Sequence, residues 1–146
     1  MRNQVVPRVI AQMLIPYIFL FGFYVITHGE IGPGGGFQGG VILAAAVILH
    51  SLVYGIEATQ RALPRVWIDR LMAFGVLLYA GVGLYGMISG NAFLDYRVLG
   101  EEPHGAEALG MTLVEMGVGL TVATVMITLF DKFSTAVPLS KTKESR

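Results

Sequence analysis

The sequence has no cysteine and few charged residues. The absence of cysteine among 146 residues excludes disulfide bonds, thiolate metal sites and a cysteine nucleophile. Charged residues make up 14% of the chain, against about 25% in soluble domains. Ten basic residues are balanced by ten acidic ones, so the sequence lacks the basic footprint of a nucleic-acid-binding protein. This composition excludes an ordinary soluble enzyme and a disordered chain, and the length predicts one domain.

Long hydrophobic runs without lysine or arginine are abundant instead. Hydrophobic residues make up 54% of the chain, and the mean hydropathy is +0.66. A bilayer core of about 30 Å needs about 20 apolar residues in a helix. Four segments reach this length, at about residues 9–27, 37–56, 71–89 and 109–130. We therefore predict an all-α integral membrane protein, with four transmembrane helices in a domain of residues 1–135 and a polar cytoplasmic tail at residues 136–146.

The basic residues predict the orientation of these spans. Nine of the ten lie before the first span, between the second and third spans, or after the fourth: Arg2, Arg8, Arg61, Arg65, Arg70, Lys132, Lys141, Lys143 and Arg146. The positive-inside rule then places both termini in the cytoplasm. No small-residue cleavage site follows the first span, so we expect it to be retained rather than removed as a signal peptide.

A glycine-rich segment joins the first two spans. Its characteristic residues are Pro33, Gly34, Gly35, Gly36, Phe37, Gly39 and Gly40. Glycines four residues apart leave one flank of a helix as bare backbone, which favours close packing against another helix. The alternative is that backbone amides at this helix start line an ion or water path. A phosphate-binding P-loop is excluded because no Lys-Ser/Thr pair follows the glycines.

This segment resembles a known family. His28-Gly29, then Pro33 to Phe37, then Gly39-Gly40 at the start of an apolar helix are similar to the MnhB-like subunits of the Mrp-type multisubunit Na⁺/H⁺ antiporters. An acidic residue before a glycine-rich stretch in the last span, Glu115, is a looser match. The same domain occurs in related membrane-bound hydrogenase complexes, and the resemblance covers nearly the whole chain.

The resemblance implies a small multi-pass subunit in a prokaryotic plasma membrane, beside larger ion-translocating subunits. Na⁺ and H⁺ would be the ions that the complex exchanges. The equivalent subunit of a hydrogenase-type complex and a purely structural scaffold remain alternatives. The resemblance supplies no established catalytic residue. The sequence itself shows no catalytic set, cofactor motif or metal-ligand spacing, so we expect neither an enzyme nor a cofactor or metal site.

Glu115 is the acidic residue inside the fourth span. A charged carboxylate near the bilayer centre costs about 2.5–3.5 kcal/mol on insertion scales, and burial favours its protonated form. It is therefore a candidate proton or Na⁺ carrier, and the alternative is a carboxyl hydrogen-bonded across a helix interface. A second polar stripe lies on the other side of this helix: Gly117, Thr121, Thr124 and Thr128. Two such faces predict a helix buried between neighbours.

The second span carries His50, with Tyr54 and Glu57 four and seven residues further on. At helical spacing these side chains share a face that runs back to the glycine-rich segment, next to His28. Histidine and glutamate chains serve as proton relays in membranes, so these four residues join Glu115 as candidates for an ion or proton path. The favoured alternative is a packed interhelical histidine, with Glu57 reaching water.

Overall fold

Four long helices dominate the fold. The computed structural model describes residues 5–29, 32–100 and 103–136. The long helices are α1 (Val5–Thr27), α2 (Gly36–Tyr54), α4 (Arg65–Ile88) and α5 (Pro103–Ala136). Each is long and apolar enough to cross a membrane. A short helix, α3 (Ile56–Ala62), follows α2, and a single 3₁₀ turn, η1 (Tyr96–Leu99), precedes α5. The predicted all-α fold with four spans is confirmed.

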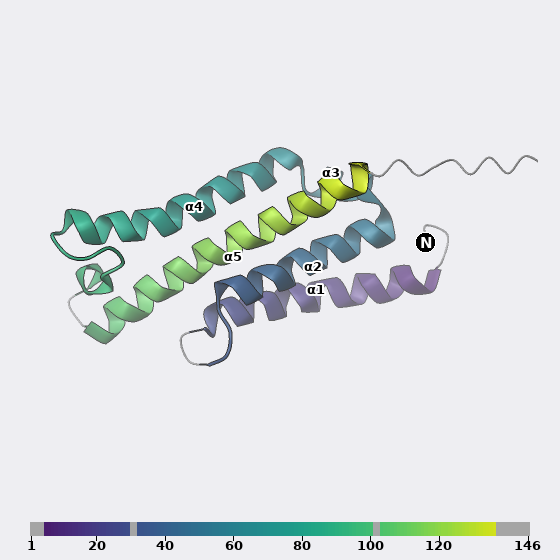
Figure 1. Cartoon of the computed structure of the whole chain (residues 1–146). Helices are drawn as coiled ribbons and strands as arrows, with labels where there is room; N and C mark the ends of the chain where they lie inside the picture. Colours follow the sequence, from purple (N-terminus) through teal and green to yellow (C-terminus); the bar gives the residue numbers. More distant parts are fainter. Residues whose placement is uncertain (1–4, 30–31, 101–102, 137–146) are drawn as a thin grey trace, which may run out of the picture.

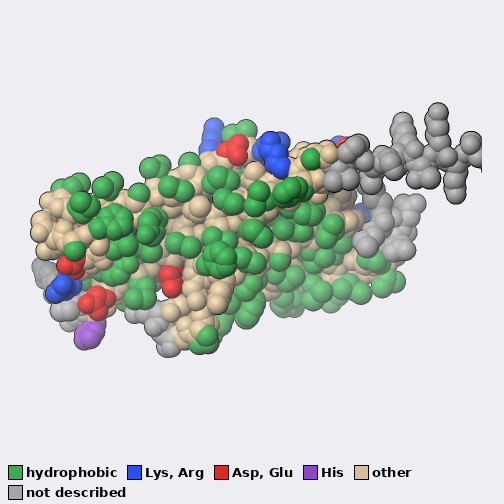
Figure 2. Space-filling view, viewed as in Figure 1, with side chains coloured by type: hydrophobic (Ala, Val, Ile, Leu, Met, Phe, Trp, Pro, Cys, Tyr) green, Lys and Arg blue, Asp and Glu red, His purple; other side chains and the backbone are tan. Residues whose placement is uncertain are grey.

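The long helices lie side by side in a row. The order across the row is α4, α5, α2, α1, and each helix packs mainly on its immediate neighbours (Figure 1). Only 17% of the apolar window of α1 is buried within the chain, against 39% for α2. Hydrophobic side chains cover most of the face seen in Figure 2, and charged ones group near the start of α4 and around η1. Lipid or other membrane chains must therefore cover much of the row.

The helices differ in length from the predicted spans. Helix α1 begins four residues before residue 9, α4 begins six residues before residue 71, and α5 extends six residues beyond 109–130 at each end. Hydropathy marks only the part of a helix that fits the hydrocarbon layer. At about 1.5 Å per residue, the 34 residues of α5 extend about 51 Å, which exceeds the bilayer core of about 30 Å.

The region after the second span contains a short helix that the sequence analysis did not predict. Helix α2 ends at Tyr54 rather than at residue 56, because Gly55 has φ 95° and breaks the helix. Helix α3 then begins at Ile56 and occupies the first part of the expected loop, and Arg65 starts α4. The predicted tail, apart from Ala136, lies outside the described residues. So do Glu30 and Ile31 of the glycine-rich segment.

The topology brings the described ends of the chain together. The start of α1, the end of α5 and the connection from α2 to α4 lie towards one end of the row, on the right in Figure 1. The glycine-rich segment and η1 lie towards the other. This arrangement agrees with an even number of spans. Which end faces the cytoplasm remains a prediction from the basic residues.

Glycines let the helix backbones approach closely. A methyl group added at Gly40 of α2 would lie 2.5 Å from the Gly119 carbonyl oxygen of α5. The same addition at Gly39 would lie 2.8 Å from the Gly22 carbonyl oxygen of α1. The sequence predicted one bare flank against one helix. The structure divides it, because Gly39 faces α1 whereas Gly36 and Gly40 face α5.

The other side of α5 packs on α4. A methyl group added at Gly75 would lie 2.8 Å from the Gly117 carbonyl oxygen and 2.5 Å from Thr121 Oγ1. The Thr121 hydroxyl donates to the Gly117 carbonyl at 2.8 Å, and Thr128 donates to Thr124 at 2.8 Å. These hydroxyls are satisfied within their own helix. Gly117 and Thr121 of the stripe therefore pack on α4, and α5 lies between two neighbours as predicted.

Replacing Gly40 with alanine should loosen the contact between α2 and α5. The added methyl group meets a backbone carbonyl that cannot rotate away, and such overpacking typically costs about 1–3 kcal/mol. We expect a lower melting temperature of the solubilised protein and a lower level in the membrane. Gly81→Ala is the matched control, because nothing lies within 4 Å of an added methyl group there. Equal behaviour of the two variants would contradict this account of the packing.

Candidate functional site

The structure brings Glu115 into contact with the glycine-rich segment. A methyl group added at Gly29 would overlap the Glu115 carboxyl group, and one added at Gly35 would lie 3.2 Å from Glu115 Oε1. At Gly36 an added methyl group would overlap the Glu115 backbone carbonyl. The two strongest features of the sequence thus form one site. We call it the glycine–glutamate joint: Gly29, Gly35, Gly36 and Glu115.

The joint lies at the N-terminus of α2. Gly35 precedes the first helical residue, Gly36, and has φ 122°, which glycine adopts readily and other residues rarely do. The first amides of a helix have no partner within it, and the helix dipole adds partial positive charge there. A carboxylate is therefore stabilised at this position.

The rest of the glycine-rich segment folds back on α1. The Gly35 amide donates to the Val25 carbonyl at 3.0 Å, and a methyl group added at Gly34 would lie 2.9 Å from the same oxygen. Pro33 is exposed, and Phe37 is 65% exposed. The segment is thus a tight turn that fixes the start of α2 against both α1 and α5. Phe37 points out of this packing.

His28 ends the first span beside the joint. Its ring stacks on Tyr24, with 4.8 Å between the ring centroids, and its amide donates to the Tyr24 carbonyl at 3.0 Å. Gly32 follows next to the ring, because a methyl group added there would lie 3.6 Å from His28 Nε2. His28 is half-buried. His28 therefore lies between Tyr24 of α1 and Gly32 of the glycine-rich segment.

Tyr96 of η1 packs on α5 near Glu115. Its ring packs over Gly110, where an added methyl group would lie 2.5 Å from Tyr96 Cγ. Burial raises the pKa of the Tyr96 hydroxyl, and the nearby acidic groups of Tyr79 and Glu115 raise this pKa further. The sequence indicates only an interfacial anchor at Tyr96, near the boundary of a span, and it gives no role for this residue beside Glu115.

His50 lies at the other end of α2, and its partner is not the predicted one. His50 Nδ1 lies 2.7 Å from Thr59 Oγ1 of α3, and the rings of His50 and Tyr54 are 4.7 Å apart. Glu57 is exposed and does not continue the face of His50, because Gly55 ends the helix between them. The expected helical alignment of Glu57 with His50 is therefore wrong. The buried Thr59, rather than Glu57, is the hydrogen-bond partner of His50.

Tyr54 links this region to the start of α1. Its hydroxyl donates to the Arg8 carbonyl at 3.0 Å, and the Arg8 guanidinium lies 5.3 Å from the centre of its ring. Along α2, His50 is fourteen residues from Gly36, or about 21 Å at 1.5 Å per residue. The face between them carries the buried Leu43 and Ala46. Within this chain the two candidate regions are therefore separate.

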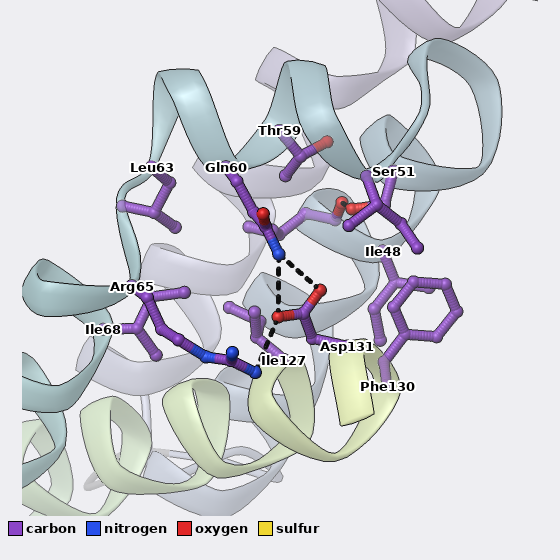
Figure 3. A pocket seen from close by; sticks show the side chains of 12 residues that line it. Ile48, Ser51, Thr59, Gln60, Leu63, Arg65, Ile68, Ile127, Phe130 and Asp131 are labelled. Atoms are coloured by element: carbon purple, nitrogen blue, oxygen red, sulfur yellow. Dashed lines mark hydrogen bonds and ion pairs between the residues drawn. The ribbon is translucent and has the colours of Figure 1, made fainter. Parts of the chain in front are cut away.

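A polar cluster that the sequence analysis missed lies near the same end (Figure 3). Asp131 of α5 accepts hydrogen bonds from Gln60 Nε2 at 3.1 Å on both carboxylate oxygens, and pairs with Arg65 at 3.0 Å. The Asp131 side chain is only 14% exposed. The cluster joins α3, α4 and α5 beside a cavity of about 20 Å³. Among the described residues, no three histidine or acidic side chains are grouped to hold a metal ion.

Comparison with known proteins identifies the family of this chain. Residues 6–128 match a family described as a domain related to the MnhB subunit of Na⁺/H⁺ antiporter. A protein of Staphylococcus haemolyticus named antiporter subunit mnhB2 is 32% identical over 134 residues, which cover 87% of this chain and 92% of the relative. Its namesake in Staphylococcus epidermidis is 31% identical over 139 residues, which cover 90% of this chain and 95% of the relative.

Replacing Asp131 with asparagine should loosen α3 from the bundle. The variant keeps the shape of the side chain but loses the ion pair with Arg65 and weakens the bonds from Gln60. Hydrogen bonds to a charged group contribute about 1.5–3 kcal/mol. We therefore expect several-fold faster trypsin cleavage at Arg61 and Arg65 in membrane vesicles whose outer surface exposes the connection from α2 to α4. Asp95→Asn is the control, because Asp95 pairs with Arg97 in the opposite connection. Unchanged cleavage in Asp131→Asn would show that the cluster does not hold α3.

Proposed function

The chain belongs to the family of domains related to the MnhB subunit of Na⁺/H⁺ antiporters, and from this membership we propose that it is the MnhB-type subunit of a multisubunit Na⁺/H⁺ antiporter. It is a transporter component of the bacterial plasma membrane, and its partners are other membrane subunits. Its role is to complete the wall of helices beside the subunits that translocate ions. The matched relatives carry antiporter names, and this favours the antiporter over the hydrogenase-type alternative.

The open row of helices supports a wall-forming role. Helices α1 and α4 at the two ends of the row bury 17% and 22% of their apolar windows within the chain. Large apolar side chains such as Tyr17, Leu20 and Ile88 are mostly exposed. A row has two faces, and in a complex these can contact different neighbours. A compact self-sufficient transporter would instead enclose its polar residues in the centre of a bundle.

The glycine–glutamate joint is the observation that carries the structural part of the proposal. Glu115 holds the turn before α2 against α5, at a helix start that stabilises a carboxylate. We assign to Glu115 a positioning role in this joint. The alternative is that Glu115 itself exchanges a proton or Na⁺ with a neighbouring subunit. Substitutions of Glu115 distinguish the positioning role from this ion-exchange role.

The orientation of the subunit is part of the proposal. Arg8, Arg61, Arg65, Arg70 and Lys132 belong to the end of the row where α1 begins and α5 ends. We place this end in the cytoplasm by the positive-inside rule. The joint and η1 then face the outer side of the membrane.

Glu115→Gln should keep the joint, whereas Glu115→Ala should disrupt it. Glutamine retains the shape and the hydrogen-bonding oxygen of the side chain but cannot carry a proton. We expect complexes with Glu115→Gln to assemble and to retain most of their Na⁺-dependent proton efflux in everted vesicles. Complexes with Glu115→Ala should assemble poorly.

Two further outcomes distinguish the roles of Glu115. Loss of transport in Glu115→Gln with normal assembly would refute the positioning role and make Glu115 part of the ion path. Gly29→Ala is an independent variant, because the atoms nearest to its methyl group would be those at the flexible end of the Glu115 side chain. It should reproduce a milder form of the Glu115→Ala defect.

Affinity purification of the tagged subunit from its native membrane tests the proposed function itself. We expect large antiporter-type membrane subunits to co-purify after gentle solubilisation, and mass spectrometry would identify them. Co-purified iron–sulfur or nickel–iron subunits would move the protein to the hydrogenase-type class. Recovery of the chain alone or as a homodimer would contradict a role as a complex subunit.

A further inference from the structure

A crevice between α1 and α2 brings His50 to the surface of the row. Gln12, Ile15 and Pro16 of α1 line one side, and His50 and Tyr54 of α2 line the other. Its volume is about 360 Å³, enough for several water molecules at about 30 Å³ each. It lies in the half of the row where α1 begins. The Arg8–Tyr54 contact lies beside it.

The polar groups around this crevice are unusual for a lipid-facing surface. Pro16 has no amide hydrogen, so it cannot donate the helical hydrogen bond that the Gln12 carbonyl would otherwise accept. Gln12 and His50 both line this crevice. A polar group without a hydrogen-bond partner in hydrocarbon costs several kcal/mol. Gln12, His50 and Tyr54 give the crevice three polar side chains. They favour water over lipid chains as its content.

Contacts with Thr59 and Tyr54 hold the His50 ring in place at the crevice. Its Nδ1 lies 2.7 Å from Thr59 Oγ1, and the same hydroxyl lies 3.2 Å from the Gly55 carbonyl. With Nδ1 held at Thr59, Nε2 is the ring nitrogen that remains for the crevice. The ring of Tyr54 packs against the imidazole, with 4.7 Å between centroids. The charged group at the crevice from α1 is the Arg8 guanidinium, and Tyr54 is the other titratable group that faces His50 from α2.

We propose that the crevice lined by Gln12, Ile15, Pro16, His50 and Tyr54 is a water-filled inlet from the cytoplasmic end of the membrane to His50. Water in the inlet pairs with the Gln12 carbonyl and amide and with the imidazole. The inlet connects His50 with the cytoplasmic solution rather than with the distant joint. The inference rests on the proposed function for its setting in an antiporter, but its test does not depend on transport.

The absence of cysteine from the chain makes thiol labelling a clean test. Single cysteines replace Gln12 and Ile15 in the crevice, and the adjacent Met13 and Leu14 serve as controls of equal depth on the exposed surface of α1. Everted vesicles with the intact complex are treated with a membrane-impermeant, charged thiol reagent. The thiols left over are then counted by the gel shift of this subunit with a large maleimide.

Labelling requires the thiolate, which forms in water but not in hydrocarbon. We expect Gln12→Cys and Ile15→Cys to react at least about tenfold faster than Met13→Cys and Leu14→Cys, since a tenfold difference corresponds to about 1.4 kcal/mol. Equally slow reaction at all four positions would show that lipid or a partner helix fills the crevice, and would overturn the proposal. Equally fast reaction at all four, or reaction only in right-side-out vesicles, would overturn it as well.

The labelling experiment tests the inlet independently of the proposed function. Only variants that purify with the same composition and in the same amount as the unmodified chain are compared. If the crevice positions fail to label in an assembled antiporter complex, the inlet is wrong while the proposed function stands. If no partner subunits co-purify, the proposed function is lost, and the contrast between paired positions still decides whether the crevice holds water.

Discussion

The close approach of α2 and α5 through their glycines is the constraint on which the rest of the structure depends. Gly40 meets the Gly119 carbonyl, and Gly36 meets the backbone of Glu115. Lipid chains are as apolar as the helix surfaces, so hydrophobic burial alone does not drive helices together in a membrane. Packing of bare backbone supplies the contact area instead. Through this contact α1 and α4, which lie at the ends of the row, are joined into one unit.

The same constraint explains the position of the one acidic side chain in the fourth span. Because Gly29, Gly35 and Gly36 have no side chains, the Glu115 carboxyl group fits against the turn and the start of α2. The helix end then offers partial positive charge where a side chain would otherwise have blocked access. Glycine therefore has two roles in this region. It permits the turn at Gly35 and it makes room for the carboxyl group.

The two ends of the row differ in chemistry. The end with the joint is built from glycine and backbone amides around one carboxyl group. The other end holds His50 with Thr59, and Asp131 with Arg65 and Gln60. Buried Leu43 and Ala46 separate the two regions along α2. The two regions are therefore not joined along α2, which agrees with a chain that serves within a larger complex.

The sequence by itself determined the four spans, the small-residue faces and the importance of the glycine-rich segment, because hydropathy and glycine spacing are local properties. It also identified Glu115 and His50, since ionisable residues are rare within apolar spans. Only the tertiary structure decided their partners. The turn at Gly55 removed Glu57 from the face of His50 and brought in Thr59, and the meeting of α2 with α5 joined Glu115 to Gly29. Such pairings depend on helix ends and on contacts between distant segments, which helical periodicity does not encode.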